Sequence, residues 1–566
     1  MQETKKCQNC TNNFVIEPDD FSFYEKMDVP APTFCPECRL VRRMTHSNEL
    51  ALYKRTCDLT GKNIITVYHP ENAFPVYDYD AWNTDRWNPY DYGVDINFSK
   101  PFFEQIADLK KVVPKPSLVK QGMFANSEYV NRVSDAKNCY MLFRATENED
   151  VMYTYISYEC KECVDCLDIY ACELCYDCIS CRSCYNIKYS QDSIDCRDSA
   201  FLFACSNCHD CFGCVNLRNK SYCIFNEQYT KAEYQQKIET YSIDLRSQIS
   251  AYKVKFKNFI AQKPHRFMSG TQNTIVSGNW INNSKNTKKS FFCTSTEDGK
   301  YLFNILNSKD CMDYFHWGKN SELMYEVANT GVNCSEVKFS NDSWSSSSNI
   351  EYCDNCPSST NCFGCVGLRN GEYSILNKKY DKEEYFTLVE KIKKHMHNMP
   401  YVDDFGRVYT YGEFFPSDLS PFAYNETAAQ EFFPLTKEQA LYKGYQWKNL
   451  EQNTYTTTLD YSDLPECIKD VEDSILDEII VCASSGSAYS KGAFRITRQE
   501  LQLYRKMNVP LPQKSFLVRH MERMEKLNPI KLYNRTTADG VDVLTSYAPD
   551  RPETILSEEG YQDEVM

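Results

Sequence analysis

Cysteine recurs with a regular spacing through the middle of this sequence. The segment CELCYDCISCRSC at residues 172–184 has a cysteine at every third position. Intervals of 24, 21 and 24 residues separate a longer series: Cys139, Cys163, Cys184 and Cys208. Short β-prone runs bounded by turn-forming residues lie between these cysteines, as is typical of stacked strands. We therefore expect a mainly β protein built on a parallel β-solenoid with a coil of about 22 residues, in which the series forms one column.

The central part of the chain is duplicated. Residues 210–239 match residues 361–390 without gaps at an offset of 151, with 16 identities in 30 positions. The second copy continues the cysteine spacing more loosely, at intervals of 18, 23 and 19 residues: Cys293, Cys311, Cys334 and Cys353. We expect two solenoid lobes, at 122–265 and 266–400.

Each predicted lobe ends in a helix. Thr230-x-x-Glu233 and Asp381-x-x-Glu384 are capping-box signatures, in which two side chains bind the free N–H groups of the first helical turn. Terminal repeats of a solenoid need such a cap over their last coil. The same signature at Thr436-x-x-Gln439 predicts a helix at about 437–443, ended by Gly444.

A second duplication joins the two ends of the chain. At an offset of 480, residues 14–44 share 11 of 31 positions with residues 494–524. Cys35 and Cys38 of the first copy face Ser515 and Val518 of the second. We expect that one copy kept a metal site and that the other lost it and folds without metal.

Two CxxC pairs form the most specific motif. Cys7 and Cys10 are followed, after 24 residues, by Cys35 and Cys38. Four thiolates form the tetrahedral shell that Zn²⁺ prefers, and a closed shell leaves no position for a catalytic water. The spacing predicts a structural zinc ribbon at 1–62. Cys57, a fifth thiol nearby, is interpreted as a small buried residue.

The central cysteines allow three interpretations: metal ligands, a ladder of buried free thiols, or disulfides and redox pairs. In the first lobe the best candidate ligands are four clustered cysteines, with His209 in reserve: Cys205, Cys208, Cys211 and Cys214. In the second lobe the CxxC-x₅-CxxC spacing indicates another set: Cys353, Cys356, Cys362 and Cys365. Neighbouring coils about 4.8 Å apart would suit any of the three interpretations.

Composition limits the class of protein. The chain has 566 residues, 42% hydrophobic and 25% charged, with a net charge of −15, so it has no overall reason to coat nucleic acid or an anionic membrane. No apolar run of about 18 residues is present. The start lacks the apolar core of a signal peptide, so we expect a cytoplasmic protein with reduced thiols.

Charge is unevenly distributed toward the C-terminus. Residues 401–480 carry sixteen acids and five bases, whereas residues 491–535 carry eleven bases and three acids. The basic segment is a candidate for binding nucleic acid or the ribosome. The alternative is that it docks on the chain's own acidic connector or on the acidic tail.

The expected organisation is a series of seven parts: an N-terminal zinc ribbon at 1–62, a connector at 63–121, two Cys-rich solenoid lobes with capping helices at 122–265 and 266–400, an acidic connector at 401–480, a degenerate ribbon-like module at 481–545 and an acidic tail at 546–566. Dinucleotide-, phosphate- and zinc-protease motifs are absent from the sequence, as is the GxSxG motif. We expect a zinc-binding scaffold that interacts with protein partners, without catalysis and without a membrane. The alternatives are a ribosome- or nucleic-acid-associated factor acting through 491–535 and, more distantly, a thiol-redox protein.

Four stretches resemble a family of zinc-ribbon, Cys-rich repeat proteins from ultra-small, candidate-phylum bacteria: FCPECR at 34–39, LYKRTCDLTGK at 52–62, the CFGCV blocks at 211–217 and 362–368, and FPSDLSPFAYNETAAQEFFPLT at 415–436. Members are often labelled CaiB/BaiF proteins, which implies a CoA-transferase, although the repeats here lack the alternating strand–helix pattern of such an enzyme. The resemblance implies paired cysteines in the C-terminal ribbon. In this chain Cys482 is present, whereas Ser485, Ser515 and Val518 stand where thiols would be.

Overall fold

The computed structural model describes residues 2–449 and 456–565. Residues 450–455 of the predicted acidic connector, including Glu451, lie outside the described residues. The chain forms two compact units: unit 1 comprises Met1–Leu118 and Met268–Lys448, and unit 2 comprises Val119–Phe267 and Asn449–Met566. Unit 1 therefore combines the N-terminal module with the second lobe, and unit 2 combines the first lobe with the C-terminal module.

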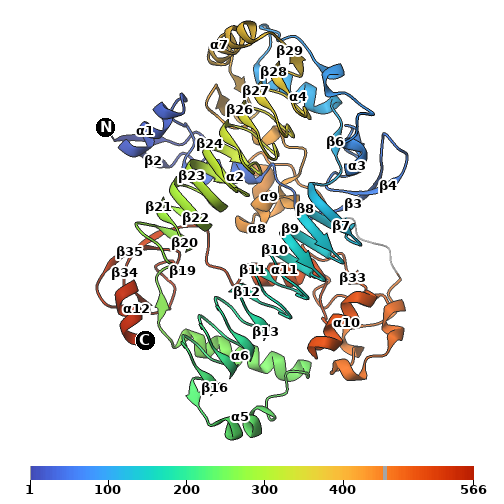
Figure 1. Cartoon of the computed structure of the whole chain (residues 1–566), viewed down its shortest axis with the longest axis vertical. Helices are drawn as coiled ribbons and strands as arrows, with labels where there is room; N and C mark the ends of the chain where they lie inside the picture. The colour runs from blue at the N-terminus through green and yellow to red at the C-terminus, as the bar shows by residue number, and fades with distance from the viewer. Residues whose placement is uncertain (1, 450–455, 566) are drawn as a thin grey trace. The chain divides into compact units, whose positions relative to one another are not determined.

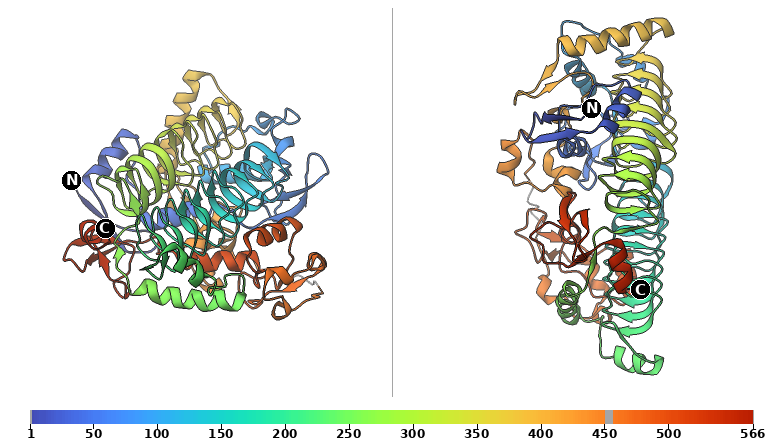
Figure 2. Two further views of the ribbon diagram at one scale, coloured as in Figure 1. Left: turned by 60° about the horizontal axis from the view of Figure 1, so that its bottom comes forward. Right: turned by 90° about the vertical axis from the view of Figure 1, so that its left-hand side faces the viewer.

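Both lobes are parallel β-solenoids, as the sequence predicts, and Figures 1 and 2 show the coils stacked within each lobe. In unit 2, β10 (Met152–Tyr158) pairs in parallel with β9 (Tyr140–Glu149) in the register Met152↔Tyr140. On its other side β10 pairs with β11 (Leu167–Tyr170) in the register Tyr155↔Leu167. Each step is 12 residues along the chain, the separation at which side chains of adjacent coils also bond to each other. The predicted coil, nearly twice as long, is therefore wrong.

The first lobe has two sheets. One runs in the order β12–β11–β10–β9–β8–β7, and its remaining strands are β7 (Lys120–Ala125), β8 (Val130–Lys137) and β12 (Ile179–Arg182). The other runs from β13 to β17: β13 (Tyr185–Lys188), β14 (Arg197–Ala200), β15 (His209–Phe212), β16 (Ser221–Ile224) and β17 (Glu227–Gln228). The last pair, β16 and β17, is antiparallel and ends the stack.

The second lobe is one eleven-stranded sheet in unit 1, with steps of 11 to 13 residues. Its strands are β19 (Gly270–Thr271), β20 (Gly278–Asn282), β21 (Lys285–Lys288), β22 (Ser290–Lys300), β23 (Phe303–Phe315), β24 (Ser321–Ala328), β25 (Ser335–Lys338), β26 (Ser348–Glu351), β27 (Thr360–Phe363), β28 (Glu372–Ile375) and β29 (Lys378–Lys379). An antiparallel pair, β28 and β29, again ends the stack.

A three-residue rhythm closes the small coil. Through the first lobe about every third residue has a positive φ, for example 58° at Asp165 and 54° at Asp168. The residue after most of these corners, such as Cys166 or Ile169, is buried in the core. A left-handed conformation is unfavourable for most L-residues, and Asn and Asp tolerate it best. These two residue types recur at the corners for that reason.

Each coil of the first lobe contains four inward side chains, most of them small. One coil contributes Cys172, Cys175, Cys178 and Cys181, and the next contributes Cys184, Ile187, Ser190 and Ser193. The thiols face carbonyl groups: Cys178 Sγ lies 3.4 Å from Tyr176 O and 3.5 Å from Ile187 O of the next coil. A narrow core favours a small apolar side chain with a weak S–H donor, which explains the frequency of cysteine.

The predicted single cysteine column is wrong. The residues that follow Cys139 and Cys163 belong to one ladder, and those that follow Cys184 and Cys208 belong to another. The longer of the two cysteine intervals spans two whole coils and keeps the column. The shorter interval is three residues shorter, which is one side of the coil, so its second cysteine lies in another column.

We expect Cys166→Leu to destabilise the protein by about 1–3 kcal/mol, because the coil already holds Ile169 and extra volume strains a packed core. Cys166→Ser should cost less, since serine fits the same kind of site and can donate to the carbonyls of Val164 and Cys175, which lie 3.3 and 3.6 Å from Sγ. Chemical denaturation of both variants checks this. Equal costs would contradict the volume argument.

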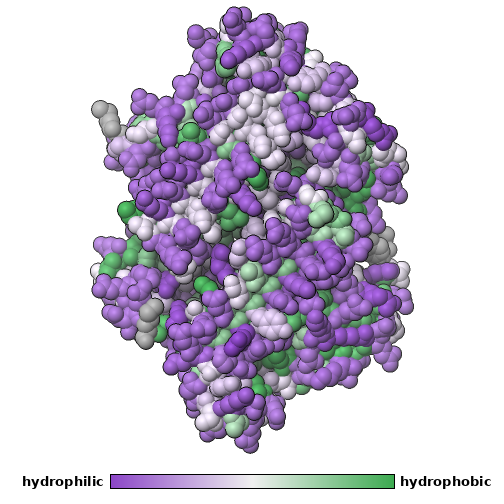
Figure 3. Space-filling view, in the orientation of Figure 1, coloured by the Kyte–Doolittle hydropathy of each residue, from purple (hydrophilic) through white to green (hydrophobic). Residues whose placement is uncertain are grey.

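Charged ladders mark one outer side of each lobe. Lys137 and Lys161 contact Glu149 at 2.6 and 3.9 Å in the first lobe. Lys285 and Lys309 contact Glu297 at 3.3 and 4.0 Å in the second. Alternating charges favour one register, because a shifted pairing would place like charges side by side. The face shown in Figure 3 is largely hydrophilic, with scattered apolar side chains.

Helices follow the last coil of each lobe, as predicted. Helix α5 (Lys231–Ile238) begins with the capping box of Thr230, and α7 (Lys382–Asn398) begins at Asp381, whose side chain accepts from Glu384 N–H. Helix α9 (Lys437–Tyr442) confirms the third capping signature. Helix α6 (Arg246–Ala261) was not predicted from the sequence; it buries Ile249 and Phe256 against the first lobe.

The two end modules repeat one order of elements. The first contains β1 (Glu3–Lys6), β2 (Asn13–Ile16), α1 (Pro18–Lys26), α2 (Pro36–Met44), β3 (Tyr53–Thr56) and β4 (Asn63–Thr66). The second contains β32 (Ile480–Val481), β33 (Ala493–Phe494), α10 (Arg498–Met507), α11 (Phe516–Met524), β34 (Tyr533–Thr536) and β35 (Asp542–Thr545). Each module thus consists of hairpins around two helices.

Shorter elements connect these parts. Unit 1 also has β5 (Val76–Tyr77), α3 (Tyr79–Trp82), η1 (Pro89–Tyr92), α4 (Phe102–Val112), β6 (Lys115–Pro116), β30 (Tyr401–Val402), β31 (Val408–Tyr409), η2 (Ser417–Leu419), η3 (Tyr424–Glu426) and α8 (Ala428–Phe432). Unit 2 has β18 (His265–Arg266), η4 (Tyr461–Asp463), η5 (Ile468–Asp470), η6 (Asp473–Asp477), β36 (Ile555–Leu556) and α12 (Glu558–Val565).

Candidate metal centre

The predicted four-cysteine site is assembled in the N-terminal module. Cys7 and Cys10 lie in the turn between β1 and β2, which Thr11 N–H closes onto Cys7 O at 2.9 Å. Cys35 is the N-cap of α2, and Cys38 lies in its first turn. The four Sγ atoms all lie within 4.8 Å of one another, and Cys10 and Cys35 are 3.7 Å apart. The second pair therefore uses a helix N-terminus where the first uses a hairpin turn.

The surroundings favour a thiolate at Cys7. Cys35 N–H donates to Cys7 Sγ at 3.2 Å, and the N-terminal end of α2 adds a partial positive charge. Hydrogen bonds from Cys35 and Cys38 hold the pKa of Cys7 well below its usual range. This group could hold a metal ion, and within residues 2–449 and 456–565 it is the one cluster of cysteine, histidine or carboxylate ligands close enough to do so.

A buried ion network fixes α2 against the second lobe within unit 1. Three arginines of the helix meet three carboxylates: Arg39, Arg42 and Arg43 with Asp313, Glu326 and Glu413. The closest pairs are 2.7–2.8 Å apart, and every side chain is at most 3% exposed. Asp313 and Glu326 lie on adjacent coils at corner positions with positive φ. The same short helix thus supplies two metal ligands and the docking contact.

Glu326→Gln should destabilise the protein by about 3–5 kcal/mol, because it keeps the shape but leaves buried arginine charge uncompensated. The matched control is Glu297→Gln on the exposed ladder, which should cost at most about 1 kcal/mol. Denaturant titration of the full chain measures both. Similar midpoints for the two variants would contradict this role for the network.

The C-terminal module has the backbone geometry of the four-cysteine site but holds one thiol where that site has four. Ser515 N–H donates to Cys482 Sγ at 3.3 Å, as Cys35 N–H does to Cys7. Cys482 therefore corresponds to Cys7, and Ser515 is the N-cap of α11 as Cys35 is of α2. Ser485 and Val518 occupy the remaining two ligand positions. Among the described residues this module holds no group of three ligands.

The C-terminal module also docks on a solenoid lobe through contacts between arginines and carboxylates. Arg519 and Arg523 contact Asp165 at 3.0 and 3.1 Å within unit 2. At least seven of the eleven bases in 491–535 have a carboxylate within 4.0 Å: Arg498, Arg505, Lys506, Lys514, Arg519, Arg523 and Lys526. Most of the acidic partners belong to the first lobe or the connector, namely Glu162, Asp165, Asp177 and Asp473.

Among the described residues, neither predicted central set forms a group of three or more ligand atoms that all lie close to one another. Cys205, Cys208, Cys211 and Cys214 point into the solenoid core from different sides of the coil, because residues three apart occupy different columns. In the second lobe Cys356 and Cys362 occupy different columns, whereas Cys353 and Cys365 lie in one column on adjacent coils. All 29 cysteines lie in the described residues, and none of them forms a disulfide. His209 is half-buried and contacts Asp210 at 2.8 Å.

Several residues around the site were missed by the sequence analysis. Asp313 and Glu326 could not be paired with α2 from the sequence, although the shared Arg39/Arg519 and Arg43/Arg523 positions were a usable signal. Asn9 was missed too, and its side-chain amide donates to Cys38 Sγ at 3.2 Å.

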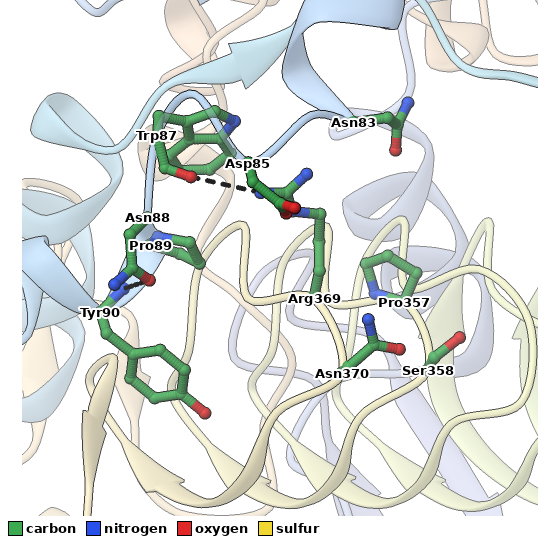
Figure 4. Close-up of a pocket in the computed structure, with 10 residues that line it drawn as sticks. All are labelled: Asn83, Asp85, Trp87, Asn88, Pro89, Tyr90, Pro357, Ser358, Arg369 and Asn370. Carbon is green, nitrogen blue, oxygen red and sulfur yellow. Dashed lines mark hydrogen bonds between the residues drawn. The ribbon is translucent and has the colours of Figure 1, made fainter.

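A cavity of about 610 Å³ lies elsewhere in unit 1, against the end of the second lobe (Figure 4). Its lining is mostly polar: Asn83, Asp85, Trp87, Asn88, Pro89, Tyr90, Pro357, Ser358, Arg369 and Asn370. Arg369 donates to the carbonyls of Trp82 and Thr84 at 2.8 and 3.0 Å, so its charge holds the surrounding loop. The lining assembles no catalytic constellation.

Comparisons with known proteins add little. No family model matches the chain, and no curated protein matches it significantly. A solved structure of a proposed acetyltransferase from Desulfovibrio desulfuricans G20 aligns over 52% of this chain and 76% of its own, at 10% identity and a TM-score of 0.10, which carries no argument. Across the described residues, the helices are too short or too polar to cross a bilayer.

Proposed function

We propose that this protein is a zinc-binding scaffold, in which a structural zinc ion folds the N-terminal module onto a rigid solenoid that binds protein partners. The observation that carries the proposal is the four-sulfur group on the helix whose arginines dock into the second lobe. Four sulfurs around Zn²⁺ at 2.3 Å would be about 3.8 Å apart, and Cys10 and Cys35 are separated by 3.7 Å. The donor set therefore suits zinc.

A scaffold role fits better than catalysis. A shell of four thiolates is closed, so the ion would have no free position for water or substrate. The resemblance to zinc-ribbon, Cys-rich repeat proteins points the same way. The nucleic-acid alternative gains no support, because most of the bases in 491–535 already face carboxylates of the same unit. The buried thiols of the lobes likewise give no support to the thiol-redox alternative.

Elemental analysis and X-ray absorption on the purified full chain test the proposal. We expect one zinc per chain with four sulfur ligands at about 2.3 Å. A chain without stoichiometric metal, or a zinc with nitrogen or oxygen ligands and an exchangeable water, would overturn it.

A further inference from the structure

A hairpin far along the sequence holds the metal-binding turn. The Gln8 side chain bonds to the backbone of Val408 in both directions: Nε2 donates to Val408 O at 3.0 Å, and Val408 N–H donates to Oε1 at 2.8 Å. Val408 begins β31, which pairs with β30 in an antiparallel hairpin. The turn that carries Cys7 and Cys10 is thus fixed from outside its own module.

The same hairpin supports Asn9 through a chain of side chains. Asn9 Nδ2 donates to Cys38 Sγ at 3.2 Å, and Arg407 Nη1 donates to Asn9 Oδ1 at 2.9 Å. Arg407 in turn pairs through Nε with the buried carboxylate of Asp403, which also accepts from Tyr409 OH at 3.3 Å. A guanidinium is only a donor, so it binds the amide oxygen and leaves the NH₂ group aimed at the sulfur.

Two related turns in the same chain serve as internal comparisons. In the C-terminal module, Ala483 and Ser484 follow Cys482, where Gln8 and Asn9 follow Cys7; Ala483 N–H donates to Gln513 O at 2.9 Å, as Gln8 N–H does to Thr33 O at 3.2 Å. In the turn between β3 and β4, Asp58 and Leu59 follow Cys57. The Gln–Asn pair occurs only in the turn that belongs to a four-thiol group.

We propose that Asn9, oriented by Arg407, is a positioning residue of the metal centre and strengthens its hold on zinc. This inference rests on the proposed zinc site. Four thiolates around a divalent ion carry two net negative charges, and an N–H donor to one sulfur, held in place by Arg407, offsets part of that charge. Partners of this kind typically change metal affinity by about 10–100-fold when removed.

Zinc affinity of the full chain, measured by competition with a chromogenic chelator, tests the proposal. Asn9→Leu should weaken binding about 10–100-fold, and Arg407→Gln should weaken it less. Asn12→Ala, a change to an exposed asparagine of the same turn, is the control and should leave affinity unchanged. Losses from Asn9→Leu and Arg407→Gln should not add in the double variant, because the arginine acts through the amide.

Cobalt substitution gives a readout that a general folding defect would not move. The thiolate-to-cobalt absorption band should shift in Asn9→Leu, while circular dichroism of the loaded protein stays that of the wild type. An unchanged affinity and an unchanged band in Asn9→Leu would overturn the inference while leaving the zinc site intact. A wild-type chain that holds no zinc would instead overturn the proposed function.

Discussion

Cys35→Ser should remove the zinc from the protein. Serine is a poor zinc ligand, and a structural site of this kind contributes folding free energy on the order of 10 kcal/mol. The residue is also the N-cap of α2, whose later turns carry the arginines that dock on the second lobe. Loss of metal should therefore free these arginines and leave Asp313 and Glu326 buried without partners.

The sequence alone predicts that loss of zinc unfolds the N-terminal module. The ion network predicts that the loss also destabilises the second lobe. Elemental analysis should show the loss of one zinc per chain, and hydrogen exchange should speed up in β23 and β24, which carry the two carboxylates. Cys482→Ser, at the corresponding position of the C-terminal module, is the matched control and should change neither the metal content nor the exchange of these strands. Retention of zinc by Cys35→Ser would show that the assignment is wrong.

Three substitutions should create a second zinc site. Ser485→Cys, Ser515→Cys and Val518→Cys together place three thiols around Cys482 in a module that keeps the backbone geometry of the N-terminal one. Cys482 Sγ is 3.8 Å from Ser515 Oγ, within the 4.8 Å that separates the corresponding Cys7 and Cys35 Sγ atoms at most. Val518 is the third residue of α11, as Cys38 is of α2.

The triple variant should bind two zinc ions per chain, and adding Cys482→Ser should bring the count back to one tightly bound ion. The new site should be the weaker of the two, because Ser484 stands where Asn9 supports the original. Adding Ser484→Asn to the triple variant tests separately whether this position affects zinc affinity. If the triple variant folds and still binds a single zinc, the module has lost more than its ligands.

The sequence predicted a solenoid but not the number of residues in each coil. The two cysteine intervals were each interpreted as one coil, whereas adjacent coils are separated by only 12 residues of chain, so each interval covers about two coils. The cysteine at every third position in 172–184 carried the correct period, since each side of the coil spans three residues. The alternation of buried and exposed residues along a strand could not reveal the shorter coil. Each side of the coil spans three residues, which is too few to show a two-residue period.

Local patterns were sufficient where neighbouring residues decide the structure. The capping signatures at Thr230, Asp381 and Thr436 begin helices, because the groups that satisfy the first turn lie within three residues of each other. The two CxxC pairs likewise identified their own four ligands, since each pair already places two sulfurs together. Helix α6 has no such signature at its start and was missed.

The sequence by itself determined that the chain is duplicated twice, that it forms parallel solenoids, and that Cys7, Cys10, Cys35 and Cys38 belong together. The tertiary structure decided how the central cysteines are arranged, because residues three apart in a CxxC occupy different columns of the coil and residues 12 apart share one. It also decided which lobe each end module docks on. Buried ion pairs such as those between Arg43 and Glu326, 283 residues apart in the chain, depend on a charge balance that forms only when the two surfaces close.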